Sequence, residues 1–442
     1  MIASTIHRGV FATACGIALA LVTGVVLALA PEDGIDDEAL TTEQLFSDLK
    51  PALFTVESVD IGSGNKQSQG SGFLVGADGR IATNYHVIEE HVQHPDRSLL
   101  RFRDHQGGTG RLEVLAVDVI HDLSLLRMVP EDLPENLPEP FALADQPPPQ
   151  GAELIALGNP YDLGISLVPG TYNGLLDGYY KPAIHFTGAL NPGMSGGPTV
   201  DRQGRVVGIN VAGMGNSVSF LVPVSFLAEL IGNAPEEPPP PERLRDGLAG
   251  IIAAHQSRML DELIAGDWSL EPFGPLMIPR QVQPWVNCTG GSTDPGLDAP
   301  WESSSSDCKV NDRIYLSRSL DTGPLEMMFI WQRSEQLNAF QFSRAFEQSN
   351  FSPYNRAGEG DTTDFECLED WVQIPSLPDR PFKASWCARG YIDYPGIYDV
   401  LYVARIQRPG PEGLFLHYTL SGVSRKDAER FHRHFLEHLR WK

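Results

Sequence analysis

Short apolar and β-branched runs, separated by Gly, Pro, Asn and Asp, follow one another along residues 52–232. Clear examples are residues 71–75, 111–117, 154–157 and 205–210. Regularly spaced short strands with turn residues between them are typical of a β-sandwich or a β-barrel. A Pro-rich break at residues 130–149 divides this stretch into two similar halves. We therefore predict an all-β domain of two small β-barrels over residues 50–232.

The pattern changes after the Pro-rich residues 235–241, which predict a polyproline II spacer within a linker at residues 233–243. Apolar residues recur at helical spacing at 242–268 and again at 424–441. Runs that favour strands lie at 325–331, 339–346, 400–406 and 414–420. We therefore predict a separate α+β C-terminal domain over residues 244–442.

Residues 10–30 form an apolar run without a charged side chain, preceded by His7 and Arg8 and followed by acidic residues. As a helix, this run is just long enough to cross a hydrocarbon core of about 30 Å. It is longer than the core of a signal peptide, and Pro31 directly follows a small-x-small cleavage pattern. We therefore predict a transmembrane anchor at residues 10–30 with residues 1–9 in the cytoplasm; a cleaved signal peptide is the alternative.

This orientation exports the rest of the chain, which begins with an acidic, helix-prone linker at residues 31–49. Four of the five cysteines lie in the last third of the chain and are disulfide candidates: Cys288, Cys308, Cys367 and Cys387. An even count fits disulfides in an oxidising compartment, with three pairings open. No Cys-x-x-Cys pair supports zinc, so we predict no metal site. We expect extracytoplasmic (periplasmic) domains anchored in the membrane or, after signal cleavage, a secreted periplasmic protein.

Composition and charge narrow the choice of partners. Hydrophobic residues make up 42% of the chain and charged residues 20%, as in an ordinary globular protein. The 57 acidic residues exceed the 33 basic ones and give a net charge of −24. This charge repels a phosphate backbone, so we predict no nucleic-acid partner.

Three short strings can carry chemistry: residues 82–88 around His86, residues 121–126 with Asp122, and residues 191–198 with Ser195. A serine hydroxyl needs a base within hydrogen-bond reach, and the base needs a partner that fixes its tautomer. A tetrahedral intermediate also needs backbone N–H donors, which the tight Gly-rich backbone at Gly193 and Ser195 can supply. This chemistry requires no cofactor.

These strings resemble the His, Asp and Ser motifs of chymotrypsin-fold serine proteases, most closely those of the HtrA (DegP-like) family. Matching residues at 72–75, 157–161 and 208–210 extend the resemblance, which covers about residues 50–232. It implies a double β-barrel in which His86 is the general base, Asp122 its orienting carboxylate and Ser195 the nucleophile. Gly193 and Ser195 would form the oxyanion hole.

The chain also departs from the family pattern. Met194 stands where HtrA proteases usually have Asn, and Pro192 fixes one φ angle in the same loop. No stretch after Pro241 resembles the PDZ domains that usually follow an HtrA protease domain. An α/β-hydrolase elbow at residues 193–197 is the weaker alternative, because its acid and histidine would follow the serine rather than precede it.

The substrate pocket is expected at Ala189, Leu190, Val211 and Ala212, where no acidic residue could pair with a basic side chain. We therefore predict a serine endopeptidase that cleaves exported proteins or peptides after small or medium apolar residues, through an acyl-enzyme. The alternative is a latent or inactive protease-fold protein that binds or senses through its C-terminal domain. The membrane is a partner through the N-terminal helix, and the family resemblance suggests a homotrimer.

Overall fold

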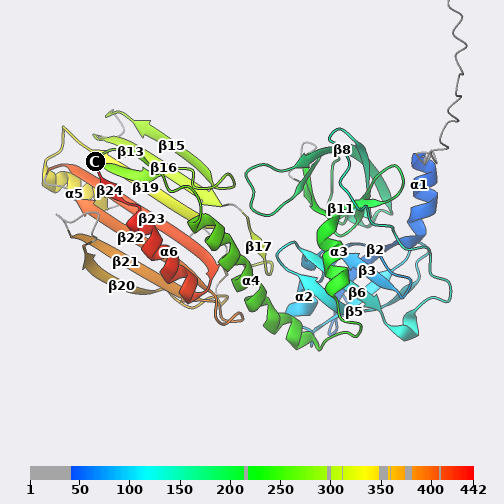
Figure 1. The fold of residues 1–442 in the computed structure, drawn as a ribbon. Helices are drawn as coiled ribbons and strands as arrows, with labels where there is room; N and C mark the ends of the chain where they lie inside the picture. The colour runs from blue at the N-terminus through cyan, green and yellow to red at the C-terminus, as the bar shows by residue number, and fades with distance from the viewer. Residues whose placement is uncertain are drawn as a thin grey trace, which may run out of the picture. The chain divides into compact units, whose positions relative to one another are not determined.

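The computed structural model describes residues 41–213, 218–295, 300–310, 312–347, 357–358, 360–373, 381–407 and 410–442 (Figure 1). These residues belong to one compact unit that spans Ala39–Lys442. The predicted membrane anchor at residues 10–30 lies outside the described residues. Within the described ranges, no helix is both long and apolar enough to cross a bilayer.

The first half of the predicted all-β stretch closes into a six-stranded antiparallel barrel in the order β1-β2-β3-β6-β5-β4. Its strands are β1 (Leu53–Asp60), β2 (Lys66–Leu74), β3 (Arg80–Thr83), β4 (Ser98–Arg103), β5 (Thr109–Asp118) and β6 (Leu123–Met128). Helix α2 (Tyr85–Gln93) leaves the barrel after β3, and α1 (Thr42–Leu49) precedes the short turn η1 (Lys50–Ala52). Closure leaves the barrel without an exposed strand edge.

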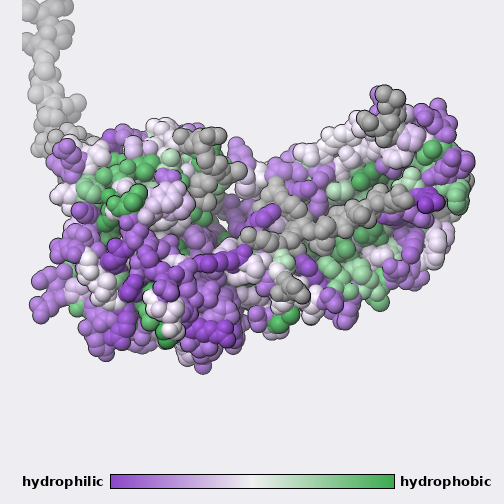
Figure 2. All heavy atoms as spheres, turned by 180° about the vertical axis from the view of Figure 1, so that it is seen from behind, coloured by the Kyte–Doolittle hydropathy of each residue, from purple (hydrophilic) through white to green (hydrophobic). Residues whose placement is uncertain are grey.

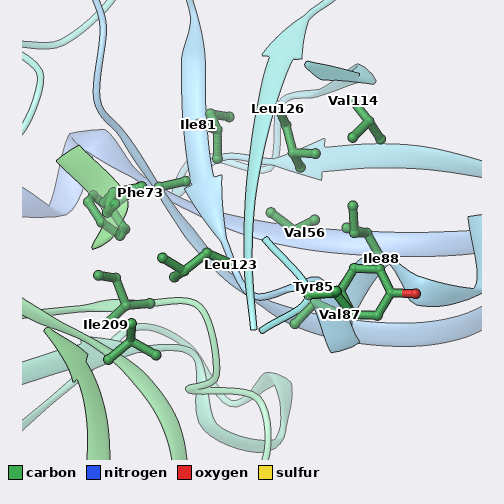
Figure 3. Packing of buried hydrophobic residues seen from close by; sticks show 14 of the residues in the cluster. Val56, Phe73, Ile81, Tyr85, Val87, Ile88, Val114, Leu123, Leu126 and Ile209 are labelled. Atoms are coloured by element: carbon green, nitrogen blue, oxygen red, sulfur yellow. The ribbon is translucent and has the colours of Figure 1, made fainter. Parts of the chain in front are cut away.

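The core of the first barrel forms from the inward-facing apolar residues of its strands. Figure 3 shows Val56, Ile81, Leu123 and Leu126 pointing toward one another inside the barrel. Tyr85 is also fully buried and belongs to the same apolar cluster. The barrel therefore buries the first residue of α2 and so sets where this helix begins.

A second closed barrel follows, with the strand order β10-β11-β12-β9-β8-β7. Its strands are β7 (Glu153–Gly158), β8 (Ser166–Leu175), β9 (Ile184–Phe186), β10 (Pro198–Val200), β11 (Val206–Gly213) and β12 (Ser219–Pro223). Short 3₁₀ turns lie in the connecting segments at η2 (Pro130–Asp132) and η3 (Pro160–Asp162). The prediction of two β-barrels is confirmed.

The C-terminal region is rich in β-structure, and its largest sheet has seven antiparallel strands in the order β15-β16-β19-β23-β22-β21-β20. These strands are β15 (Asn287–Thr293), β16 (Glu302–Val310), β19 (Leu325–Arg333), β20 (Glu366–Val372), β21 (Phe382–Gly390), β22 (Tyr398–Gln407) and β23 (Glu412–Val423). Smaller sheets join β13 (Leu270–Phe273), β14 (Leu276–Pro279) and β24 (Arg440–Trp441), and β17 (Ile314–Tyr315) with β18 (Asp321–Thr322). Figure 1 shows the large sheet with α6 lying along it.

Helix α3 (Val224–Asn233) contacts strands of both barrels, and the helices of the C-terminal region are α4 (Pro241–Ile264), α5 (Ala339–Glu347) and α6 (Arg425–Glu437). Both α4 and α6 contact the central strand β23. Phe431 and Phe435 on α6 are fully buried against the sheet, where Tyr418 packs edge-on against both rings. Helix α6 therefore covers the apolar face of the sheet, as its large excess of apolar residues on one side requires.

The segment at residues 339–346 corrects a prediction, because it is not a strand but the helix α5. Phe340 and Phe342 alternate as in a strand, yet Phe342 and Phe346 are the buried pair, one helical turn apart, and Phe340 is 78% exposed. Asn338 starts the helix through two reciprocal hydrogen bonds. Its side chain accepts the backbone N–H of Gln341, and the side chain of Gln341 accepts the backbone N–H of Asn338.

The strand register places the cysteines in directly opposed pairs and so decides among the three pairings. Cys288 faces Cys308 across β15 and β16, and Cys367 faces Cys387 across β20 and β21. Both pairs are disulfide-bonded. Each bond therefore fastens an outermost strand of the seven-stranded sheet to its neighbour.

The Pro-rich segment before α4 lies against the first barrel. Arg127 of β6 donates to the carbonyl of Glu236 and pairs with the carboxylate of Glu237. Helix α4 begins at Pro241, a position where a missing N–H costs no helical hydrogen bond. Figure 2 shows one face of the molecule, on which hydrophilic residues predominate and hydrophobic residues form separate patches.

Candidate active site

The α2 helix and the loop before β6 bring His86 and Asp122 together. Nδ1 of His86 lies 2.6 Å from Oδ2 of Asp122, and Oδ1 of the same carboxylate accepts the backbone N–H of His86 at 2.9 Å. A carboxylate can only accept, so Nδ1 carries the proton and leaves Nε2 as the free acceptor. The carboxylate thus selects the tautomer in which Nε2 can take up a proton.

The backbone of Asp122 is held in an unusual conformation. Its φ is +58°, in the left-handed region that Asp tolerates better than most residues. The carbonyl oxygen of Asp122 accepts the side-chain amide of Asn84 at 2.7 Å and the backbone N–H of Tyr85 at 3.2 Å. The segment just before His86 therefore clamps the backbone of its partner, and strain of this kind is common at functional sites.

The surroundings of His86 favour its charged form. Burial alone lowers the pKa of the imidazole, but the charge and hydrogen bond of Asp122, with a contribution from Glu89, outweigh burial and raise the pKa of His86. A proton taken from a neighbouring hydroxyl would therefore be held more readily than by an isolated histidine.

Ser195 lies in the loop before β10, close to the residues that precede His86. The backbone oxygen of Ser195 accepts the N–H of Ser71 at 2.7 Å, and a Cβ at Gly196 would overlap the hydroxyl of Thr83. Oγ of Ser195 donates to the carbonyl of Val211 at 2.9 Å. Among the described residues, no hydrogen bond joins Ser195 to His86.

The acceptor of that bond comes from a bulge in β11. In the pairing with β12, Asn210 faces Leu221 and Ala212 faces Phe220, so Val211 has no opposite residue. A bulged residue leaves the hydrogen-bond ladder, and its backbone groups can point elsewhere. The bulge frees the carbonyl of Val211 to accept from Ser195.

Met194 anchors the serine loop by apolar packing. Its side chain is fully buried in the core of the second barrel, in a cluster that includes Tyr172 and Phe186. The backbone oxygen of Met194 also accepts from Asn210 and from the N–H of Gly197. The core of the second barrel therefore accommodates the Met side chain that stands here in place of the usual Asn.

Gly193 holds the conformation that a backbone donor site requires. Its φ is +96°, and a Cβ there would overlap the carbonyl oxygen of Asn159. The carbonyl of Pro192 accepts the N–H of Tyr161, so the N–H of Gly193 points the opposite way across the trans peptide. The carbonyl of Met194 accepts the side-chain amide of Asn210, so the N–H of Ser195, on the opposite side of the same trans peptide, points away from Asn210. Neither N–H donates to another described residue.

The expected pocket residues lie on two segments, the stretch before the serine loop and strand β11. Ala189 is exposed, whereas Leu190 is half-buried and packs against the cluster around Met194. Val211 lines a cavity of about 250 Å³ beside Asp122. The backbone of Ala212 belongs to β11, but its side chain lies outside the described part.

Two residues close to His86 carry no sequence signal that could have identified them. Glu89 lies one turn further along α2, and its side chain is only 4% exposed. Tyr315 comes from the C-terminal region and packs edge-on against the His86 ring, with 6.2 Å between ring centroids. In the described ranges, no group of His, Cys, Asp and Glu side chains could hold a metal ion.

Residues 70–209 match the family described as the trypsin-like peptidase domain. The chain is 32% identical over 176 residues to "Serine protease HTRA2, mitochondrial" from Bos taurus, an alignment that covers 37% of this chain and 36% of that protein. The chain carries an HtrA/DegP-like, trypsin-like serine protease domain.

Two further relatives are similar to part of the chain. "Protease Do-like 1, chloroplastic" from Arabidopsis thaliana is 29% identical over 223 residues, or 45% of this chain and 48% of that protein. "Probable periplasmic serine endoprotease DegP-like" from Hahella chejuensis is 33% identical over 175 residues, or 37% of this chain and 35% of that protein. The chain thus spans less than half the length of each of these relatives.

Proposed function

We propose that this protein is a serine endopeptidase that hydrolyses peptide bonds through an acyl-enzyme on Ser195. The observation that carries the proposal is the pairing of His86 with Asp122, which leaves Nε2 as a free acceptor in the same site as Ser195. The protease domain and the family of its relatives support the same reaction.

In the proposed reaction, the Ser195 hydroxyl turns from the carbonyl of Val211 to Nε2 of His86. His86 takes the hydroxyl proton while Oγ attacks the substrate carbonyl, and Asp122 stabilises the imidazolium. The N–H groups of Gly193 and Ser195 receive the negative oxygen. His86 then gives its proton to the leaving amine, and a water molecule repeats the sequence to release the acid.

In this proposal the turn of Ser195 is a rotation about its side-chain bond. The buried side chain of Met194 and the left-handed backbone of Gly193 hold the loop on either side of it. The hydrogen bond to Val211 is therefore a resting contact that a bound substrate replaces.

We further propose substrates with small or medium apolar residues at the cleavage site. Leu190, in the apolar cluster that contains Met194, and Val211, whose carbonyl accepts from Ser195, supply apolar surface near the nucleophile. Exported proteins are the proposed substrate class, because both disulfides are typical of an oxidising compartment. Anchoring through residues 10–30 and assembly as a homotrimer belong to the same proposal.

The alternative function, a latent or inactive binding protein, has one observation in its favour. The hydroxyl of Ser195 donates to Val211 and not to His86, so the nucleophile is not activated in this arrangement. Under this alternative, the contact to Val211 would persist when a substrate is present.

The deciding experiment is labelling of the purified full-length protein with a fluorophosphonate, beside the Ser195→Ala variant. The probe reacts only with an activated serine and needs no knowledge of the natural substrate. Labelling that disappears in Ser195→Ala supports the peptidase. A folded protein that does not label, even with exported unfolded proteins added, contradicts it and favours the binding protein.

A further inference from the structure

A hairpin of the C-terminal region, residues 312–322, packs into the first barrel beside the catalytic helix. Ile314, Leu316 and Leu320 are each at most 3% exposed and share one apolar cluster with Tyr85 and Val87 of α2. The matched family model covers residues 70–209, so nothing in it accounts for this contact. The hairpin is therefore part of the surroundings of the site.

Buried hydrogen bonds fix the hairpin to both ends of α2. The carbonyl of Leu316 accepts the Tyr85 hydroxyl at 3.1 Å and the Gln93 side-chain amide at 3.2 Å. Arg318 reaches the carbonyl of Gln67 on β2 and lies 3.8 Å from Glu89. A loosely resting loop would not bury such polar groups, because each unmet partner costs free energy.

A half-buried lysine, Lys181, fastens the other end of the hairpin to the aspartate loop. The carboxylate of Asp312 accepts the backbone N–H groups of Tyr180 and Lys181 at 2.5 and 2.9 Å. Nζ of Lys181 donates to the carbonyl of Ile120, two residues before Asp122, and to the carbonyl of Arg313. The hairpin, the β8–β9 connection and the aspartate loop are thus one connected structure.

Tyr315 of the hairpin contacts two residues of α2. Its ring packs edge-on against His86, and its hydroxyl donates to Glu89 at 3.4 Å. These two contacts set the direction of the ring, which is half-buried.

The same ring lines the cavity of about 250 Å³ that begins at Asp122. Other parts of its wall come from both barrels and include Leu176, Val211 and Phe220. The wall is therefore largely apolar, and the carboxylate of Asp122 is already occupied by His86. Ala189 and Leu190, which precede the serine loop, do not line this cavity.

We propose that Tyr315 closes a substrate subsite, in which the C-terminal region and the protease domain together bind an apolar side chain of the peptide substrate at a position other than the cleaved residue. The proposal rests on the proposed peptidase function. The cavity lies directly beside the His86–Asp122 pair, so a peptide bound at Ser195 can place a neighbouring side chain in it. Tyr315 is on this view a specificity-determining residue.

The test is a positional scan on the full-length protein with peptides that vary one residue at a time from Gly to Ala, Val, Leu and Phe. Tyr315→Ala removes the wall, and we expect the preference for Leu over Gly at one position to fall about tenfold in kcat/KM. Tyr315→Trp narrows the cavity and should reject Phe and Leu at that same position. Tyr315→Phe keeps the ring and should retain the wild-type order of preference.

Ile392→Ala is the matched control, because Ile392 is an exposed apolar residue of the C-terminal region that does not line the cavity. Fluorophosphonate labelling of each variant reports an intact nucleophile separately from selectivity. If the Tyr315→Ala variant reacts with the fluorophosphonate but keeps the wild-type residue preference at every peptide position, the proposed subsite is wrong. A uniform rise in cleavage of all peptides also overturns it and identifies the hairpin as a block. Absence of labelling in the wild type instead contradicts the peptidase itself.

Discussion

The two barrels and the seven-stranded sheet use β-structure for different purposes. Each barrel closes on itself, and the helix and loops between the strands carry the candidate chemistry at His86, Asp122 and Ser195. The sheet is open, is covered by α6, and is fastened at its outer strands by Cys288–Cys308 and Cys367–Cys387.

This difference indicates where function and stability are separable. In the barrels, a change at a loop residue can abolish chemistry while the closed strands and their core remain. In the sheet, a change at a disulfide should weaken the fold without touching the reacting groups. The hairpin with Tyr315 is where the two regions meet, so a change there should affect both.

The largest effect is expected for Asp122→Asn. Asn also tolerates a φ of +58°, so the loop should fold as before, while the tautomer and charge support of His86 are lost. We expect kcat/KM to fall on the order of 10⁴-fold. Asp118→Asn is the matched control, because the carboxylate of Asp118 lies 2.6 Å from a different histidine, His121, and is not bonded to the serine. Loss of the Asp118 carboxylate should change kcat/KM only severalfold.

The same pair predicts the pH dependence of the reaction. His86 must be neutral to accept a proton, and its pKa is raised, so kcat/KM should decline as the pH falls through a value above about 6.5. In Asp122→Asn the residual activity should decline only at lower pH. An acid limb that does not move between the two proteins would contradict the assigned role of Asp122.

The next effect concerns the backbone donors. Gly193→Ala introduces a Cβ that overlaps the carbonyl of Asn159 and disfavours the φ of +96°. We expect the labelling rate and kcat to fall about 10²- to 10³-fold, as when one oxyanion donor is lost. Gly232→Ala in α3 meets no atom within 4 Å and should leave both unchanged. Equal losses in the two variants would show that the loop does not hold the oxyanion.

The double variant Cys288→Ala, Cys308→Ala tests the sheet side of the comparison. The bond closes a sequence separation of 20 residues, so its loss should lower the free energy of unfolding by about 3 kcal/mol in urea titrations. Labelling of Ser195 under native conditions should persist, because both cysteines pack in the apolar cluster of the large sheet and not in the clusters that hold the two barrels. Loss of labelling at a temperature where the sheet is folded would contradict the separation of stability in the sheet from chemistry in the barrels.

The smallest effect is expected at Glu89, where the two regions meet. Burial, then the charge of Glu90, raises the pKa of Glu89 to about 7, against the opposing influence of Arg318 and the Tyr315 hydroxyl. The folded state then holds a proton that the unfolded state releases near pH 4.3, so stability falls as the pH rises from about 4.3 to 7. Glu89→Gln should remove this decline and raise the free energy of unfolding at pH 8 by on the order of 2 kcal/mol. The two proteins should be nearly equal at pH 4, and a constant difference between them would contradict the shifted carboxylate.

Much of the barrel fold and its candidate site could be predicted because both depend on local chemistry. The strands around residues 71–75 and 205–210 are short runs of apolar and β-branched residues between turn signals. Ser195 stands in a string whose glycines are required by backbone geometry, as the φ values of Gly193 and Gly196 show. Such requirements are visible in the sequence because few other residue types could meet them.

The C-terminal sheet was harder to predict for a physical reason. Strand β16 begins with a run of serines and alternates only at its end, where Cys308 and Val310 are buried, and β20 is exposed along most of its length. Neither strand shows the alternation of a half-buried strand over its full length. In α5, an accidental alternation of Phe340 and Phe342 concealed the helical pair of Phe342 and Phe346. Pairing with neighbouring strands, and not local pattern, places these elements.

The amino-acid order alone was sufficient for the double barrel, the order of His86, Asp122 and Ser195, and an even set of cysteines, because each follows from residue type and spacing. The cysteine pairing, the bulge at Val211 and the contact of Tyr315 with His86 required the folded chain. Tyr85 and Leu316 are 231 residues apart in sequence and meet only when the hairpin packs on the first barrel. Contacts over such distances depend on the summed packing of many elements, which no local pattern records.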